Sequence, residues 1–291
     1  MKLFLKIILT LLALYLAFRQ VDLDQLSQIV QGIKWFWLVP AFACFLLSKL
    51  VAAFRLQAFF SSTGLLLDTV YNIRLYLVGM FYNIFLPGGI GGDGYKVFQL
   101  KNAAGAKVKP LIIASLLDRL GGLAAICFLA FFAGIFSNFY LSLDKFRWVF
   151  WAGMSLAFPT YYFIVRWFFA SFSHIVGKSI LLSILLQLFI SGTVVFILLA
   201  LGVEQYFIEY YSLFMIATIA ATLPLTIGGI GIREAVLVYL PGIVSTDVSQ
   251  NTAVALSLIF LVITLLTSFA GAFIDLEQPR LKVAATANKE A

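Results

Sequence analysis

Charged residues are scarce in this chain. Only 11% of its 291 residues are Asp, Glu, Lys or Arg, whereas 63% are hydrophobic; soluble domains carry roughly 25% charged residues. Apolar stretches of about 20 residues recur from end to end, and no long polar segment separates them that could fold as an aqueous domain. This composition excludes a soluble globular protein and predicts one membrane domain.

Cysteine and histidine are also rare. Cys44 and Cys127 both lie inside apolar runs, so neither a disulfide framework nor a cysteine-based metal site is indicated. His174 is the single histidine, which excludes a histidine-based metal cluster by number. No HExxH, GxSxG or complete P-loop motif occurs. We therefore expect no cofactor, no metal and no visible catalytic constellation.

Six apolar runs are long enough, or nearly so, to cross about 30 Å of hydrocarbon. They cover residues 3–18, 36–54, 111–135, 148–167, 180–202 and 251–274. Two more apolar regions, 71–100 and 211–240, are interrupted by Pro and Gly. A smooth helix cannot pass through Pro87-Gly88-Gly89 or through Pro224 and the glycines from Gly228 to Gly231, because Pro lacks an N–H donor and Gly resists ordering. Each region is predicted to be a re-entrant hairpin or a discontinuous span.

The distribution of Lys and Arg favours two re-entrant hairpins. With both termini in the cytoplasm, thirteen basic residues lie inside, four lie outside and three lie at membrane depth, as the enrichment of basic residues on the cytoplasmic side requires. The basic residues are scattered over short segments, so nucleic acid is not an expected partner. In this topology the first break enters from the cytoplasm and the second from outside.

The two halves, about 1–140 and 145–278, then follow the same order of elements with opposite insertion, and both contain GGIG. This order matches the inverted-repeat plan of transporters. We predict an all-α polytopic membrane protein with six full spans and two Gly/Pro-broken re-entrant hairpins, or eight segments by hydropathy. Residues 1–278 form a single transmembrane domain, and residues 279–291 form a short cytoplasmic tail.

Ionisable residues inside hydrocarbon cost at least about 2.5 kcal/mol each on insertion scales, so they are candidates for function. Near the first break, Asn83, Pro87, Gly88, Asp93 and Lys96 lie in one segment. If a helix begins near residue 92, its N–H groups favour an anion at the break. Asp93 is equally suited to cap that helix, and the two roles are compatible.

Two further pairs lie in apolar surroundings, Asp118-Arg119 and Arg233-Glu234. Arg119 is suited to bind a phosphate through its planar guanidinium, while a buried ion pair that locks the bundle is the structural alternative. Arg233 and Glu234 follow the second GGIG and have the same alternatives. As adjacent helical residues, they are expected to contact different partners.

The chain resembles the lysylphosphatidylglycerol synthase transmembrane family over nearly its whole length. The resemblance is carried by Asn83-x-x-x-Pro87-Gly88 with a following acid and base, by Asp118-Arg119, and by Gly228-Gly229-x-Gly231-x-Arg233-Glu234 after Pro224. It implies a flippase-like fold and movement of a lipid or lipid-linked headgroup between leaflets. Family members often have Arg-Gly-Glu where this chain has Gly89 to Asp93, so one positive charge is missing here. The soluble aminoacyl-transferase domain of two-part members is absent, so synthase activity is not expected.

The leading hypothesis is a flippase of the plasma or inner membrane whose partner is a phospholipid or a polyprenyl-phosphate-linked lipid. The expected path residues are Asn83, Pro87, Gly88, Asp93, Lys96, Asp118, Arg119, Arg233 and Glu234. One alternative is a membrane enzyme that modifies a lipid headgroup, with Asp93 or Glu234 as general base. The other is a scaffold subunit of an envelope assembly. A homo-oligomer is compatible with the sequence, which does not define the lipid, the direction or the energy source.

Overall fold

The computed structural model describes residues 15, 23–85, 91–138, 145, 147–222, 231–243 and 248–276. Throughout these residues the regular structure is helical, so the predicted all-α polytopic fold is confirmed. Five helical segments are long and apolar enough to cross a membrane: Trp35–Ser61, Val108–Ile135, Arg147–Phe168, Ala170–Ala200 and Gln250–Phe273. They correspond to five of the six predicted spans. The sixth, 3–18, lies outside the described residues.

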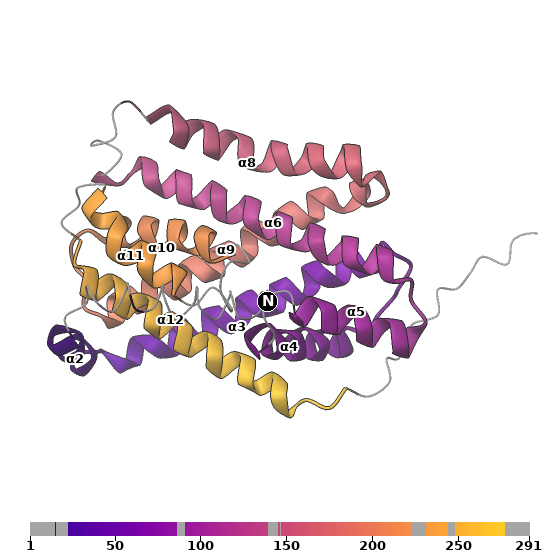
Figure 1. Cartoon of the computed structure of the whole chain (residues 1–291), viewed down its shortest axis with the longest axis horizontal. Coiled ribbons are helices and arrows are strands. Elements are labelled where there is room, and N and C mark those ends of the chain that lie inside the picture. The colour runs from indigo at the N-terminus through magenta and orange to yellow at the C-terminus, as the bar shows by residue number, and fades with distance from the viewer. Residues whose placement is uncertain are drawn as a thin grey trace, which may run out of the picture.

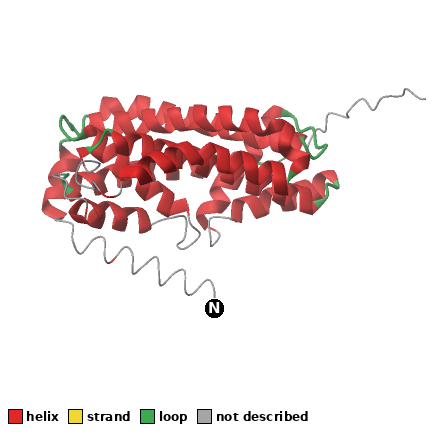
Figure 2. Ribbon diagram, turned by 90° about the horizontal axis from the view of Figure 1, so that it is seen from above, coloured by secondary structure: helices red, strands yellow, loops and turns green. Residues whose placement is uncertain are grey.

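The long helices run roughly along one axis of an elongated bundle (Figures 1 and 2). Helix α3 (Leu38–Ser61) packs most extensively against α9 (Val176–Ala200) at the centre. Helix α6 (Val108–Ile135) contacts α8 (Arg147–Phe168) on its outer side, and α12 (Gln250–Ala270) crosses obliquely on the opposite side of the bundle. Short elements complete this frame: α2 (Leu23–Gln31), η1 (Trp35–Trp37), η3 (Ala170–Ile175) and η4 (Gly271–Phe273).

Two pairs of shorter helices occupy the regions in which breaks are predicted. Helix α4 (Thr69–Phe85) packs against α5 (Gly91–Ala104), and α10 (Phe207–Thr222) packs against α11 (Ile232–Ile243). The pairs lie towards opposite ends of the long axis (Figure 1). Pro87, Gly88 and Pro224 fall outside the described residues. Each region therefore forms two packed helices, while re-entrant insertion and the inverted repeat remain predictions.

The two largest hydrophobic clusters of the described core meet along α3. One includes Phe45 and Val51 and extends over α9, α10 and α12. The other includes Leu56 and Phe59 and extends over α4, α5 and α6. Arg55 lies on α3 between these two sets. Outside the core, many large apolar side chains are exposed, as expected of a surface in contact with lipid.

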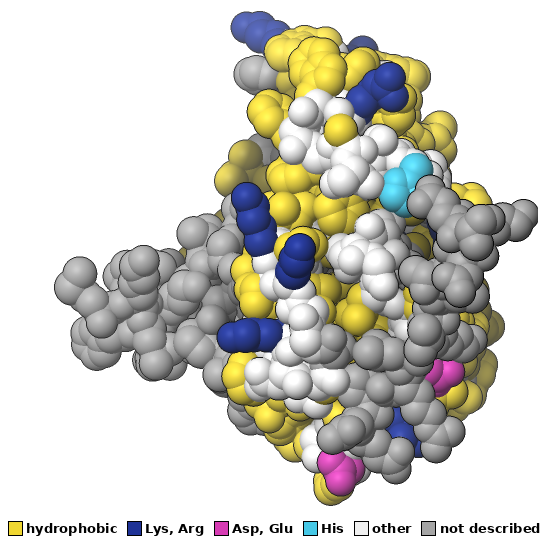
Figure 3. Space-filling model, turned by 90° about the vertical axis from the view of Figure 1, so that its right-hand side faces the viewer, with side chains coloured by type: hydrophobic (Ala, Val, Ile, Leu, Met, Phe, Trp, Pro, Cys, Tyr) yellow, Lys and Arg dark blue, Asp and Glu magenta, His cyan; other side chains and the backbone are white. Residues whose placement is uncertain are grey.

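One end of the bundle is rich in basic side chains (Figure 3). The exposed basic residues at the helix ends that meet there are Arg74, Lys101, Lys107, Lys109, Arg166 and Lys178. This clustering agrees with the charge bias from which a cytoplasmic face is predicted. Arg55 departs from that prediction. The sequence assigns it to the cytoplasmic segment after the span 36–54, but α3 continues to Ser61 and buries its side chain to 5% exposure.

Candidate functional site

The first helix pair is held together by a very close backbone approach. Gly92 lies so near the carbonyl of Gly79 that a Cβ atom at residue 92 would be 1.8 Å from its oxygen. The side-chain oxygen of Asn83 accepts a hydrogen bond from the N–H of Gly92 at 2.9 Å. Asn83 thus satisfies an N–H of the first turn of α5, a group that has no partner within the helix. Asn83 closes the α4–α5 pair and orients the start of α5.

Next to this contact, three charged side chains form one cluster. Asp93 on α5 accepts a hydrogen bond from Lys96 Nζ at 3.1 Å and pairs through its other oxygen with Arg119 Nε on α6. Lys96 is 4% exposed, its carbon chain crosses Gly79, and its Nζ lies 4.6 Å from the ring centre of Tyr76. The cluster contains two cations and one carboxylate, so it carries one excess positive charge.

A groove of about 770 Å³ extends from this cluster between α5 and α6. Asp93 and Arg119 line its polar part, and Thr222, at the end of α10, also lines it. Its walls are mainly apolar and include Phe98, Ile112 and Leu116, all of which are exposed. Lys101, near the end of α5, lines it as well. The groove therefore joins a charged interior to an apolar surface, and it brings both helix pairs to one cavity.

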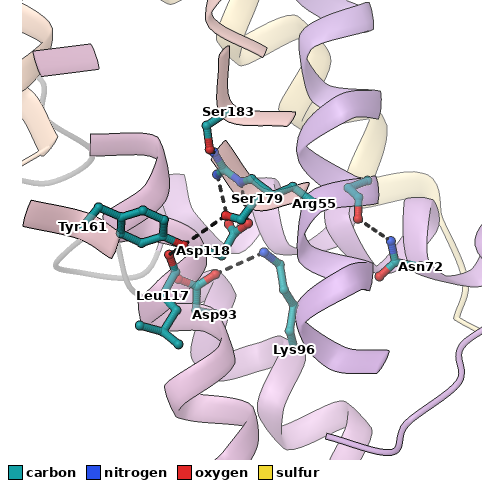
Figure 4. A network of polar contacts seen from close by, with 10 residues as sticks. Arg55, Asn72, Asp93, Lys96, Leu117, Asp118, Tyr161, Ser179 and Ser183 are labelled. Carbon is teal, nitrogen blue, oxygen red and sulfur yellow. Dashed lines mark hydrogen bonds and ion pairs between the residues drawn. The ribbon is translucent and has the colours of Figure 1, made fainter. Parts of the chain in front are cut away.

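The second ionic site is a buried pair between α3 and α6 (Figure 4). Arg55 donates from Nε to Asp118 Oδ1 at 2.7 Å and from Nη2 to Oδ2 at 3.2 Å, which is a bidentate arrangement. Its Nη1 donates to Ser183 on α9 at 2.8 Å. Gly122 leaves room for the guanidinium, since a Cβ there would come within 3.3 Å of it. Three helices are locked together at this point.

Behind this pair, a hydroxyl contact connects α8 with α9. The Tyr161 hydroxyl lies 3.0 Å from Ser179 Oγ and 3.4 Å from the carbonyl oxygen of Leu117 (Figure 4). Gly121 makes this approach possible, because a Cβ there would meet both side chains at 3.1 Å. The small residues of α6 thus provide the close packing that interhelical polar contacts require.

The third site lies at the start of α11. Glu234 is 2% exposed; its Oε2 accepts from the N–H of Gly231 at 2.8 Å and its Oε1 accepts from the Ser257 hydroxyl at 2.6 Å. Arg233 turns elsewhere, with its guanidinium 5.4 Å from the ring centre of Phe214 and 5.1 Å from that of Phe260. The two adjacent residues therefore contact different partners, as their helical spacing predicts.

These sites form a row of polar groups across the bundle. Tyr76 lies within electrostatic range of the Asp93–Arg119 pair and of the Arg55–Asp118 pair. Lys49 lies within such range of both Arg55 and Arg233. The row thus leads from the groove, through the buried Arg55–Asp118 pair between α3 and α6, to Arg233 in the first turn of α11.

The predicted site residues are distributed over all three sites. Asn83, Asp93, Lys96 and Arg119 come together at the first. Asp118 belongs to the second, where the structural alternative, a buried ion pair, is realised with Arg55 rather than within its own helix. Arg233 and Glu234 form the third. Pro87 and Gly88 lie outside the described residues.

Sequence reasoning missed Arg55, Ser183 and Tyr76. The signal for Arg55 was present, because the apolar pattern resumes after it at Leu56 and Phe59. A longer window would have placed this arginine inside the span. Ser183 and Tyr76 carry no such signal, since hydroxyl groups are unremarkable in an apolar helix.

The comparison with protein families gives one match. The profile described as Lysylphosphatidylglycerol synthase TM region matches residues 3–177 and 169–271. These two segments span almost the whole chain, including all three sites. Searches of curated proteins and of solved structures find no match.

Proposed function

Because the chain belongs to the lysylphosphatidylglycerol synthase transmembrane family, we propose that it moves an anionic phospholipid or a lipid-linked headgroup between the leaflets of a membrane. Family membership implies a lipid-related function in a membrane. The observation that carries the finer proposal is the groove between α5 and α6. It combines a charge cluster with an apolar wall that continues to the exposed surface.

This combination suits a phospholipid, whose headgroup is charged and whose acyl chains are apolar. Arg119 is half-buried in the groove, and its guanidinium can bind phosphate oxygens in two parallel hydrogen bonds. Phe98, Ile112 and Leu116 offer the apolar contact for an acyl chain. The headgroup then enters the polar row while the acyl chains stay in the bilayer.

The two carboxylates suggested as general bases have other partners. Asp93 is bound by Lys96 and Arg119, and both oxygens of Glu234 accept hydrogen bonds. A general base needs a lone pair directed at the substrate proton. These contacts favour a role for Asp93 in holding the two cations and a structural role for Glu234 over proton abstraction by either carboxylate. We propose that the path lies within one chain, so that transport does not require a homo-oligomer. The protein would lie in the plasma or inner membrane with both termini in the cytoplasm.

Reconstitution in liposomes tests this proposal. We expect the wild-type protein to move a fluorescent anionic phospholipid between leaflets, and Arg119→Gln to slow this movement about tenfold, because a charged hydrogen bond contributes about 1.5–3 kcal/mol. Arg166→Gln, at an exposed position on α8, is the matched control and should keep the wild-type rate. Mass spectrometry should find the lipid chemically unchanged.

Two results would contradict lipid movement itself, and a third would contradict the role of the groove. The first is a wild-type rate no higher than that of empty liposomes with any anionic phospholipid or polyprenyl-phosphate sugar. The second is a chemically altered headgroup, which would favour the enzyme. If the Arg119→Gln variant moves lipid as fast as the wild type, the groove between α5 and α6 is not part of the transport path.

A further inference from the structure

Two partly buried cations have no carboxylate ion-pair partner in the described part of the chain. Lys49 on α3 and Arg233 on α11 are within electrostatic range of each other, yet neither forms an ion pair there. The Nε of Arg233 is buried and has no hydrogen-bond partner among the described residues. The nearest carboxylate, Glu234, is already held by Gly231 and Ser257. Unpaired charges of one sign are unfavourable in a medium of low dielectric constant.

Both cations lie against the faces of aromatic rings. Lys49 Nζ lies 4.1 Å from the ring centre of Phe45, while Arg233 stacks on Phe214 and Phe260. Phe260 contacts both other rings, at centroid distances of 5.5 Å from Phe45 and 5.0 Å from Phe214. The two cations thus lie over one continuous ring cluster contributed by α3, α10 and α12. Cation–π contacts attract the cations but supply no negative charge.

The charge balance of the side chains around Lys49 and Arg233 indicates which ligand charge they would favour. Among the described residues, Lys49 is within electrostatic range of Arg55 and Arg233, Arg55 is paired with Asp118, and Arg233 is within electrostatic range of Glu234. Within this set of described residues, three cations face two carboxylates, so one positive charge is left over. A ligand of charge −1 would neutralise this set. Lys49 and Arg233 are only partly buried, and Arg233 lies in the first turn of α11, where helix N–H groups also favour an anion.

We propose that Lys49 and Arg233 form a second anion site, which binds a singly charged phosphate group. The phosphodiester of a phospholipid and free inorganic phosphate share this chemistry. The choice of a lipid phosphate rests on the proposed function, because the polar row connects this site with the groove at Arg119. A headgroup then has two binding sites along the polar row, one at Arg119 and one between Lys49 and Arg233.

Equilibrium binding to the purified full chain in detergent tests the site without transport. The probe is radiolabelled dihexanoyl phosphatidylglycerol, with inorganic phosphate and uncharged dihexanoylglycerol as competitors. We expect two sites per chain in the wild type and one in Lys49→Met, with the lost site at least about tenfold weaker, as removal of a charged contact predicts. Arg233→Met should lose the same site, Arg233→Lys should keep it, and Arg119→Gln should lose the other one.

Thermal unfolding without added ligand separates binding from a structural role. Lys49→Met removes an uncompensated charge from the core, so its Tm should equal or exceed that of the wild type, although its binding is lost. If Lys49 instead had a structural role, Lys49→Met would have a lower Tm than the wild type. Competition by phosphate would assign the site to a free oxyanion, and its failure would assign the site to lipid.

The inference is overturned if Lys49→Met and Arg233→Met retain both sites, or if uncharged dihexanoylglycerol competes as well as the phospholipid. Its failure is distinct from that of the proposed function. If liposomes show no lipid movement but Lys49→Met still removes one binding site, the proposed transport function is wrong and the second anion site stands. If lipid moves while both variants keep both sites, only the second site is wrong.

Discussion

Replacing Asp118 with Asn is expected to lower the free energy of unfolding by about 3–5 kcal/mol, the range observed when one partner of a buried ion pair is removed. Asp118 is 9% exposed and Arg55 is 5% exposed, so water cannot solvate the guanidinium that remains. The amide of the variant can still accept a hydrogen bond through one oxygen, and Ser183 still accepts from Nη1, but neither group supplies a negative charge for the guanidinium. Because the pair joins α3 to α6, the loss should reach the whole bundle. Equilibrium unfolding in mixed micelles measures the change.

The control is a double replacement, Asp118→Leu with Arg55→Met. It removes both charges and fills similar volume, and such replacements of buried pairs are often neutral or stabilising. The double variant should therefore be more stable than Asp118→Asn. Equal stability of Asp118→Asn and the wild type would show that the guanidinium finds other compensation.

Replacing Gly92 with Ala is the second large effect that we expect. The added methyl group would lie 1.8 Å from the carbonyl oxygen of Gly79 and 2.9 Å from Asn83 Cγ. Because the first of these is a backbone atom, α4 and α5 must separate. We expect a loss of about 3 kcal/mol, the upper part of the usual range for overpacked sites. A thermal unfolding scan in detergent would show it as a lower Tm.

Gly94 offers a matched control on the same turn of α5. A Cβ at residue 94 meets no atom within 4 Å, so Gly94→Ala should leave Tm unchanged or raise it, since Ala favours helix by about 1 kcal/mol. Two alanine variants with the same Tm would contradict the close approach. Lipid movement should fall with Gly92→Ala as well, because Asp93 follows directly.

Local physics explains which parts of the fold were predictable. The thickness of the hydrocarbon sets the length of a span, and Pro and Gly interrupt helices wherever they stand. The five spans and the two interrupted regions therefore follow from the sequence. The end of α3 does not, because Arg55 marks a boundary only if it faces water. Its actual partner, Asp118, lies 63 residues away along the chain.

The candidate site was predictable to a similar depth. Charges in apolar surroundings identified Asp93, Lys96, Arg119 and Arg233, because hydrocarbon does not tolerate them without a reason. Which of these side chains contact one another depends on how distant helices pack, and the spacing of residues in the sequence does not predict this packing. Asn83 was identified as a path residue, but its hydrogen bond to Gly92 gives it a positioning role.

The ion pair between Asp93 and Arg119 also has a kinetic consequence. In the proposed transport, an arginine that already holds a carboxylate can bind a phosphate only by exchange, so Asp93 would compete with the ligand for Arg119. Competition weakens binding, but it also returns the arginine to its resting partner when the ligand leaves. A carrier needs such release more than it needs tight binding. If the proposed transport takes place, Asp93 would therefore favour rapid release of the lipid over long occupancy of the site.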